Sequence, residues 1–251
     1  MSPPMVGVRV WWARLALLPP WYAEVMTEVE RARHDRMVRT ADRRRFAMGC
    51  VLLRVVAGRS LGSAPEALVV DRTCGGCGQP HGRPTLAGHP DLRVSLSHSG
   101  ERVVLALAGG VEVGVDVERV RPHGDLERMA GKFLSPAERD AWSAVPPPLR
   151  EEAFATYWTR KEAVVKATGD GLSTPIGRVE VSPPGSPPAL TAWQGREPLV
   201  ARTTLHALDA GPGYVAHLAV MDAAGTPVSV MGAAGMPVTE SWVTMRLREA
   251  R

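Results

Sequence analysis

Apolar and polar residues recur with two different periods along this chain, which predicts a mixture of strands and helices. From Val8 to Leu18 the alternation is weak and predicts a first strand, ended by Pro19–Pro20. The apolar runs at 103–108 and 111–117 predict two further strands. Beyond Leu172 the pattern again predicts strands, at residues 179–181, 189–193, 199–208 and 214–220.

The helical period marks the segments between these strands. Residues 21–58 are predicted to be helical and to include a buried helix from which Arg54 faces solvent. A second helix begins after Ser135, where Pro136 and Glu138 complete a capping box. Glu138 therefore has a structural explanation of its own.

A third helix runs from near Glu151 to Gly169, where glycine ends it. Trp158, Glu162 and Lys166 are spaced four residues apart, so they share one face of this helix. A Glu–Lys pair is also common on ordinary helices, where it contributes a few tenths of a kcal/mol. The helix alone does not separate a site from a structural pair.

A second group of carboxylates lies on the strand at 111–117. The period of two places Asp116 and Glu118 on the same side. Two like charges so close together are unfavourable unless a cation lies between them, and an all-oxygen set suits Mg²⁺. The alternative is a solvated strand end.

Ser97 and His98 end another predicted strand just before Gly100. A serine nucleophile with a histidine base fits poorly, because adjacent residues on a strand point to opposite faces and no nucleophile-elbow sequence is present. A phosphate-binding edge explains both residues more simply.

Positive charge gathers in the first third of the chain. The predicted helical segment contains a dense run of basic residues: Arg31, Arg33, His34, Arg36, Arg39, Arg43, Arg44 and Arg45. The run is explained either as a solvated helix face or as an edge that binds phosphate through guanidinium groups. Further along, Gly82-Arg83-Pro84 predicts a rigid turn that presents one cation.

Three cysteines, an odd number, do not make a disulfide framework in a chain of 251 residues. Cys74 and Cys77, followed by His81, suggest zinc, but a structural zinc site needs four ligands and no second pair has the usual spacing. Cys50 and His89 are the remaining candidates. A zinc-bearing, arginine-rich nucleic-acid binder would leave the three carboxylates unexplained.

The overall composition narrows the partner class. The net charge of +4 suits an anionic partner, whereas the aromatic content of 5% disfavours a stacking surface for single-stranded nucleic acid. The apolar run Leu15 to Leu18 is too short to span a bilayer, and no signal-peptide pattern precedes it. We expect a soluble cytoplasmic protein of one large or two small domains, with no nucleic-acid or membrane partner.

Taken together, two segments resemble the signature motifs of the Sfp-type 4′-phosphopantetheinyl transferases. They are Gly114-Val115-Asp116-Val117-Glu118 and Trp158-x-x-Lys161-Glu162-Ala163-x-x-Lys166-Ala167-x-Gly169, and their spacing is also similar to that of the family. Three shorter motifs extend the resemblance over residues 8–222: Gly82-Arg83-Pro84, Ser95-x-Ser97-His98-Ser99 and Phe133-Leu134-Ser135-x-x-Glu138.

The resemblance implies an α+β fold of two similar, pseudo-symmetric α/β halves with the active site in the cleft between them. The halves would be residues 1–117 and 118–222, followed by a linker and tail at 223–251. Proteins of this two-halved type usually act as monomers, so a monomer is expected.

The implied reaction transfers 4′-phosphopantetheine from coenzyme A to a serine of an apo acyl or peptidyl carrier protein, with Mg²⁺, and releases 3′,5′-ADP. Asp116, Glu118 and Glu162 would hold the ion, and Lys161 and Lys166 would lie against the phosphates. The other implied coenzyme A contacts are Ser97 and His98 at the diphosphate or 3′-phosphate, Gly82, Arg83 and Pro84 along the adenine, and Arg45, with Arg33 or Arg31, at the 3′-phosphate.

The catalytic roles are less specific. Positive charge from Lys161 and Lys166 would stabilise the reacting phosphate. The base is Glu162, Glu138 or a metal-bound water, and we expect Glu162 to bind metal while Glu138 assists. Phe133 and Leu134 are expected to be exposed where an acidic carrier protein from fatty-acid, polyketide or non-ribosomal peptide synthesis docks. The alternative function is an Mg²⁺-dependent phosphohydrolase of coenzyme A or a related nucleotide diphosphate.

Overall fold

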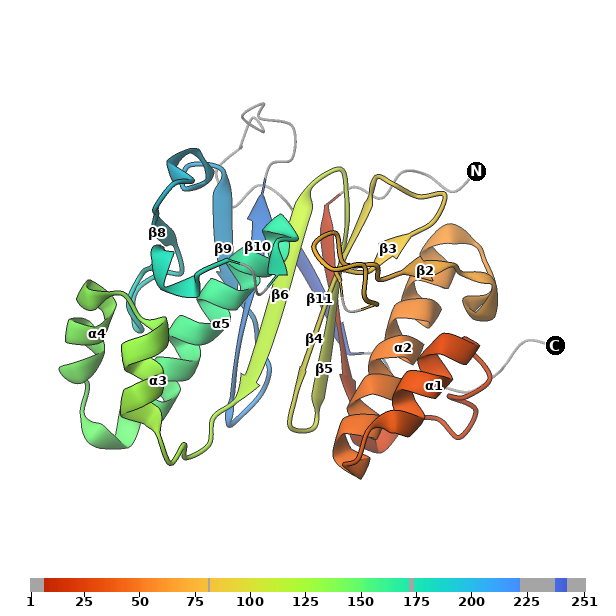
Figure 1. The fold of residues 1–251 in the computed structure, drawn as a ribbon, viewed down its shortest axis with the longest axis horizontal. Coiled ribbons are helices and arrows are strands. Elements are labelled where there is room, and N and C mark those ends of the chain that lie inside the picture. The colour runs from red at the N-terminus through yellow and green to blue at the C-terminus, as the bar shows by residue number, and fades with distance from the viewer. Residues whose placement is uncertain (1–6, 81, 172–173, 222–237, 243–251) are drawn as a thin grey trace.

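The computed structural model describes residues 7–80, 82–171, 174–221 and 238–242. Helices and strands occur in successive groups along the chain (Figure 1). In chain order they are β1 (Val8–Arg14), α1 (Glu28–Arg36), α2 (Thr40–Leu61), β2 (Val70–Asp71), β3 (Thr85–Leu86), β4 (Leu92–Ser99), β5 (Arg102–Gly109), β6 (Glu112–Arg119), α3 (Leu126–Phe133), α4 (Pro136–Ser143), α5 (Arg150–Thr168), β7 (Val179–Val181), β8 (Leu190–Trp193), β9 (Thr203–Ala207), β10 (Tyr214–Met221) and β11 (Val238–Trp242).

The fold repeats one topology twice. In each repeat a strand leads to a long helix, then to a short two-stranded hairpin and two further strands. The sheet order is β1-β5-β4 in the first repeat and β6-β10-β9 in the second, so the last strand lies in the middle both times. The prediction of two similar α/β halves is confirmed. The predicted boundary after residue 117 falls inside β6.

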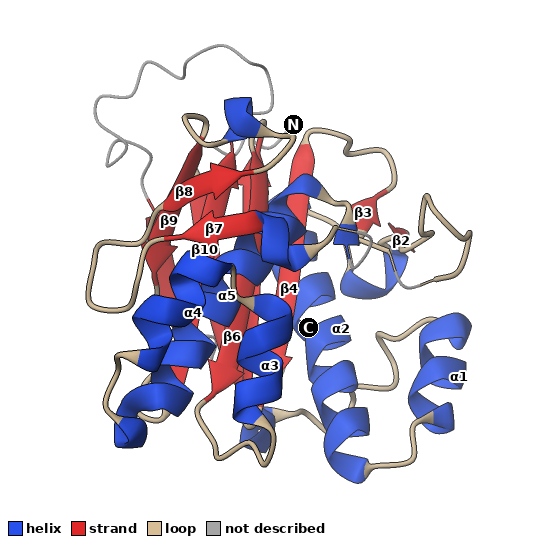
Figure 2. Cartoon of the chain, turned by 60° about the vertical axis from the view of Figure 1, so that its left-hand side comes forward, coloured by secondary structure: helices blue, strands red, loops and turns tan. Residues whose placement is uncertain are grey.

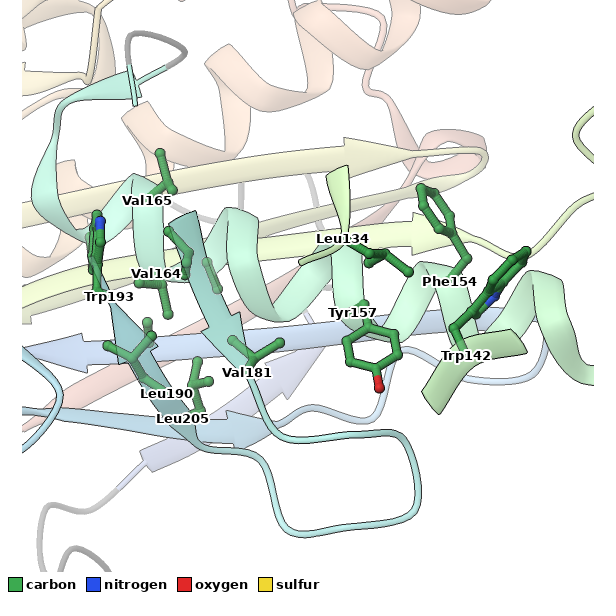
Figure 3. Close-up of a cluster of buried hydrophobic side chains, with 14 of the residues drawn as sticks. Leu134, Trp142, Phe154, Tyr157, Val164, Val165, Val181, Leu190, Trp193 and Leu205 are labelled. Carbon is green, nitrogen blue, oxygen red and sulfur yellow. The ribbon is translucent and has the colours of Figure 1, made fainter. Parts of the chain in front are cut away.

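Each repeat buries its long helix against its own sheet. Helix α2, with α1 beside it, covers the first sheet, and α5, with α3 and α4, covers the second (Figures 1 and 2). Around α5 the core includes Trp142, Phe154, Tyr157 and Trp193 (Figure 3).

Serine side chains join the two sheets, because β4 and β6 face each other without a backbone ladder. Ser95 Oγ accepts a hydrogen bond from the Val115 N–H at 3.0 Å, and Ser99 Oγ accepts one from the Arg119 N–H at 3.1 Å. The alternating serines of β4 therefore satisfy backbone donors of β6 that would otherwise lack partners.

Gly114 brings α5 unusually close to β6. A Cβ at this position would lie 2.0 Å from the Ala163 carbonyl oxygen and 2.4 Å from the Ala167 nitrogen. Only glycine permits this approach, and both alanines are fully buried. The contact sets the height of the helix above the strand.

The helix ending at Gly169 is confirmed, since α5 stops there with a left-handed φ of 80°. The first strand ends at Arg14, earlier than predicted, and the helical stretch predicted over residues 21–58 consists mainly of two helices, α1 and α2. None of the helices in the described part of the chain is long and apolar enough to span a bilayer. The predicted linker and tail lie largely outside the described residues, although β11 pairs in parallel with β1.

The prediction that Arg54 faces solvent is wrong. Its side chain is 1% exposed, and Nε donates to Glu30 Oε2 at 3.0 Å. Its Nη1 donates to the Leu68 carbonyl at 2.8 Å. Because the long side chain reaches a carboxylate and a carbonyl from other segments, its charge is compensated inside the core.

Candidate active site

The centre of the site is a hydrogen-bonded group of three side chains. Lys166 Nζ on α5 lies 2.5 Å from Asp116 Oδ1 on β6. Ser97 Oγ on β4 donates to the same carboxylate oxygen at 2.7 Å and lies 3.0 Å from Lys166 Nζ. The structure thus brings together residues from both halves, and the helix face predicted from the sequence meets the predicted carboxylate strand.

Glu118 and Glu162 add two further carboxylates beside this group. Burial raises the pKa of Glu118, with a further rise from Asp116, while a hydrogen bond from Ser99 opposes it. Burial, followed by the charge of Asp116, also raises the pKa of Glu162, and Lys166 opposes the rise. Three carboxylates with one lysine between them favour binding of another cation.

The donor set fits Mg²⁺, which prefers oxygen ligands and keeps several waters. Asp116 Oδ2 is buried and has no hydrogen-bond partner among the described residues, so a lone pair is available to an ion. As they stand, no three His, Cys, Asp or Glu side chains in that part of the chain are placed to bind one ion together. Binding of one ion by all three carboxylates together would require at least one of these side chains to move. Of the candidate zinc ligands, Cys50 is buried, Cys77 is exposed, and His81 lies outside the described residues.

A pocket of about 220 Å³ opens next to Lys166 and Ser97. Its walls contain the cations Arg33, Arg72 and Lys166, together with Phe46, Gly49, Cys50, Leu96, Ser97 and His98. Burial lowers the pKa of His98, and the charges of Lys166 and Arg45 lower it further. The pocket is therefore positively charged with His98 neutral, which suits a phosphate group.

Arg45 and Arg83 lie near the pocket but are paired with other groups. Arg45 donates to Asp42 Oδ1 at 2.5 Å and to the Gly100 carbonyl at 3.2 Å. Arg83 pairs with Glu112 and donates to the Ala167 carbonyl at 3.2 Å. Both terminal nitrogens of Arg45 are used in these bonds, whereas the buried Arg83 Nη2 has no hydrogen-bond partner among the described residues.

The remainder of the predicted turn is structural in this conformation. A Cβ on Gly82 would lie 2.8 Å from the Thr73 carbonyl oxygen, which explains the glycine. Pro84 is buried immediately before β3.

Lys161 and Glu138 are not brought to the other site residues. Lys161 is fully buried, and its Nζ lies 2.5 Å from Glu138 Oε2 and 2.9 Å from the Phe133 carbonyl oxygen. Glu138 also accepts hydrogen bonds from the Ser135 and Val181 N–H groups. Since Lys161 is one position from Glu162, it points about 100° away around the helix.

Arg72 was missed by the sequence analysis. It lines the pocket, and its buried Nε has no hydrogen-bond partner among the described residues. Burial lowers the pKa of its guanidinium. Since Arg72 lies in a loop without periodicity, no pattern could have marked it.

Known proteins of one enzyme superfamily are similar to this chain in sequence. The family model of the 4′-phosphopantetheinyl transferase superfamily matches residues 112–219, from the start of β6 into β10. The 4′-phosphopantetheinyl transferase HetI of Nostoc sp. is 32% identical over 66% of this chain and 69% of its own. A 4′-phosphopantetheinyl transferase of Bacillus subtilis is 29% identical over 61% of this chain and 64% of its own.

Among solved structures, the holo-[acyl-carrier-protein] synthase of Thermotoga maritima matches 45% of this chain and 63% of its own, with 23% identity and a TM-score of 0.37. That score is too low to support further conclusions. The sequence matches are sufficient: the chain belongs to the 4′-phosphopantetheinyl transferase superfamily. The enzyme class expected from the motifs is confirmed.

Proposed function

We propose that this protein transfers the 4′-phosphopantetheine group of coenzyme A to a serine of an apo acyl or peptidyl carrier protein, with Mg²⁺, and releases 3′,5′-ADP. The observation that supports this most is the Asp116–Lys166–Ser97 group beside a cation-lined pocket. The site offers both the acidic ligands for a metal and the basic groups for a phosphorylated cofactor.

The basic residues would bind and orient the cofactor. Lys166 is 28% exposed by side chain and lies at the pocket wall, where its ammonium can move from Asp116 to a phosphate oxygen. Arg33, Arg72 and His98 supply further donors on the same wall. Fixed positive charge stabilises the charge that develops on phosphoryl oxygens during transfer.

Asp116, Glu118 and Glu162 would hold Mg²⁺, and the bound ion would neutralise phosphate oxygens of the cofactor. The predicted bases are Glu162, Glu138 and a metal-bound water, and Glu138 is the one we set aside. Both oxygens of Glu138 already accept hydrogen bonds, and its partner Lys161 is fully buried. We assign Glu138 and Lys161 to positioning α5, because their pair connects this helix to α4.

Carrier proteins would dock near the end of α3. Phe133 packs edge-on against Trp158 with ring centroids 4.8 Å apart, and Lys132 lies over the Phe133 ring. Leu134 is only 6% exposed, so the expectation that it is an exposed docking contact is wrong. A surface with Phe133 and Lys132 suits an acidic, partly apolar helix.

The test is the intact mass of a purified apo carrier protein after incubation with this protein, coenzyme A and Mg²⁺. The proposal expects a gain equal to one phosphopantetheinyl group, which is lost in EDTA. Consumption of coenzyme A without any gain, across carrier proteins of all three pathways, would instead support the phosphohydrolase.

A further inference from the structure

The loop that contains Cys74 and Cys77 is an ordered turn. The Cys74 N–H donates to the Gln79 carbonyl at 2.9 Å, and the Gly78 N–H donates to the Cys74 carbonyl at 2.8 Å. The Gly82 N–H donates to the Arg72 carbonyl at 2.7 Å and closes the base of the loop. The two cysteines are therefore held at a defined separation.

Donor groups surround the sulfur of Cys74. The backbone N–H groups of Gly76 and Cys77 and the Cys77 thiol hydrogen-bond to it, and together they lower the Cys74 pKa. Gly76 has no side chain to cover the Cys74 sulfur, whereas a Cβ at this position would lie 3.9 Å from it. Such an environment favours a reactive thiolate.

Cys50, the third cysteine of the chain, has the opposite environment. It is 1% exposed, and burial raises its pKa to about 12. Cys77 is exposed and Cys74 is half-buried. Reaction with a solvent-borne disulfide is therefore confined to the loop pair.

The same loop borders the cation-lined pocket. Arg72, at the base of the loop, lines the pocket directly. Pro80, at its end, accepts a hydrogen bond from Arg33 Nη1 at 2.9 Å. Arg33 lies over the Phe46 ring at 5.1 Å, and both residues also line the pocket. The conformation of the loop thus sets the position of two of the three cations.

We propose that Cys74 and Cys77 form a reversible disulfide that controls the affinity of this pocket for the phosphorylated nucleotide end of its ligand. The choice of ligand rests on the proposed function. The oxidant is a low-molecular-weight disulfide, RSSR. The Cys74 thiolate attacks one of its sulfurs and releases RS⁻; the Cys77 thiolate then attacks Cys74 Sγ and releases the second RS⁻. Two electrons pass to RSSR, and both thiol protons end on the two RSH products.

Oxidation is expected to strengthen binding. Cys74 and Cys77 lie three residues apart on a turn closed by the hydrogen bond from the Gly78 N–H to the Cys74 carbonyl, a separation that a disulfide can span, so the bond forms with little backbone movement and holds the loop in its present conformation. In that conformation Arg33 and Arg72 both line the pocket, and a ligand no longer has to order them. Preorganisation of this kind lowers Kd by roughly three- to tenfold.

The experiment compares oxidised and reduced full-length protein. The ligand is adenosine 3′,5′-bisphosphate, which contains no thiol and cannot reduce the bond, and its Kd is measured by calorimetry. Disulfide formation is followed separately, by iodoacetamide alkylation in denaturant and intact mass. Three adducts are expected for the reduced chain, which has three cysteines, and one, on Cys50, for the oxidised chain. Cys77→Ser, treated identically, should show the same Kd under both conditions.

The Kd values and the adduct counts together test redox control of the pocket. A lower Kd on oxidation in the native sequence, absent in Cys77→Ser, supports the proposal. Three adducts after oxidation, or equal Kd values despite one adduct, would overturn redox control and leave the transferase intact. No binding in either form would overturn the proposed function as well.

Discussion

Replacing Gly114 with alanine tests whether the close approach of α5 to β6 assembles the site. The new Cβ would be 2.0 Å from the Ala163 carbonyl oxygen and 2.4 Å from the Ala167 nitrogen. Both are backbone atoms, so no rotamer change relieves the clash, and the helix must move by about 1 Å or more to reach normal contact distance. Overpacking of this kind costs about 1–3 kcal/mol.

The same shift should carry Lys166 on α5 away from Asp116 on β6, because these two elements move apart. In the native structure Lys166 Nζ and Asp116 Oδ1 are 2.5 Å apart. A displacement of this size lowers the rate about 100-fold. Urea denaturation measures the stability loss, and carrier-protein modification measures the rate. Gly131→Ala is the matched control, because nothing lies within 4 Å of a Cβ there and Gly131 is helical. A Gly114→Ala protein with unchanged stability and rate would refute the reasoning.

Three further predictions concern buried titratable side chains. His217 is buried, and its pKa is lowered to about 3, so the unfolded chain binds more protons below pH 6.5 and stability falls with acidification. Between pH 7 and pH 5 His217 alone should cost about 2 kcal/mol, measured by urea titration; a slope unchanged in His217→Gln would contradict this. Mg²⁺ should stabilise the folded protein and so raise its thermal midpoint; at 100 times the Kd for Mg²⁺ the gain in unfolding free energy is about 2.7 kcal/mol. The rise in midpoint should vanish in Asp116→Asn but persist in Asp140→Asn on α4. Lys161→Met should lower the free energy of unfolding by about 3–5 kcal/mol, because Glu138 is left buried without its ion-pair partner. The double variant Lys161→Met/Glu138→Leu should recover part of this loss. Additive losses in the double-mutant cycle would argue against the ion pair.

Some of the site could be predicted from local periodicity. Asp116 is placed by the strand period and Lys166 by the helix period, and each pattern concerns neighbours within one element. Their contact required only that α5 pack on β6. Ser97 followed from its position near the end of a polar strand edge.

Other residues depended on contacts between distant segments. Lys161 is buried because Glu138 and the Phe133 carbonyl, both more than twenty residues away, compensate its charge. Arg54 is buried for the same reason through Glu30. No local pattern reports whether a charged side chain will find such a partner, so both were expected to face a ligand or solvent.

The central claim is that the Lys166 ammonium at the two-half boundary acts in phosphopantetheinyl transfer. Single-turnover modification of an apo carrier protein, followed by intact mass, tests it with Lys166→Met against Arg59→Met, an exposed cation near the end of α2. We expect a rate loss of about 100-fold or more for Lys166→Met and none for Arg59→Met. Modification by Lys166→Met at the rate of the native sequence would contradict the account.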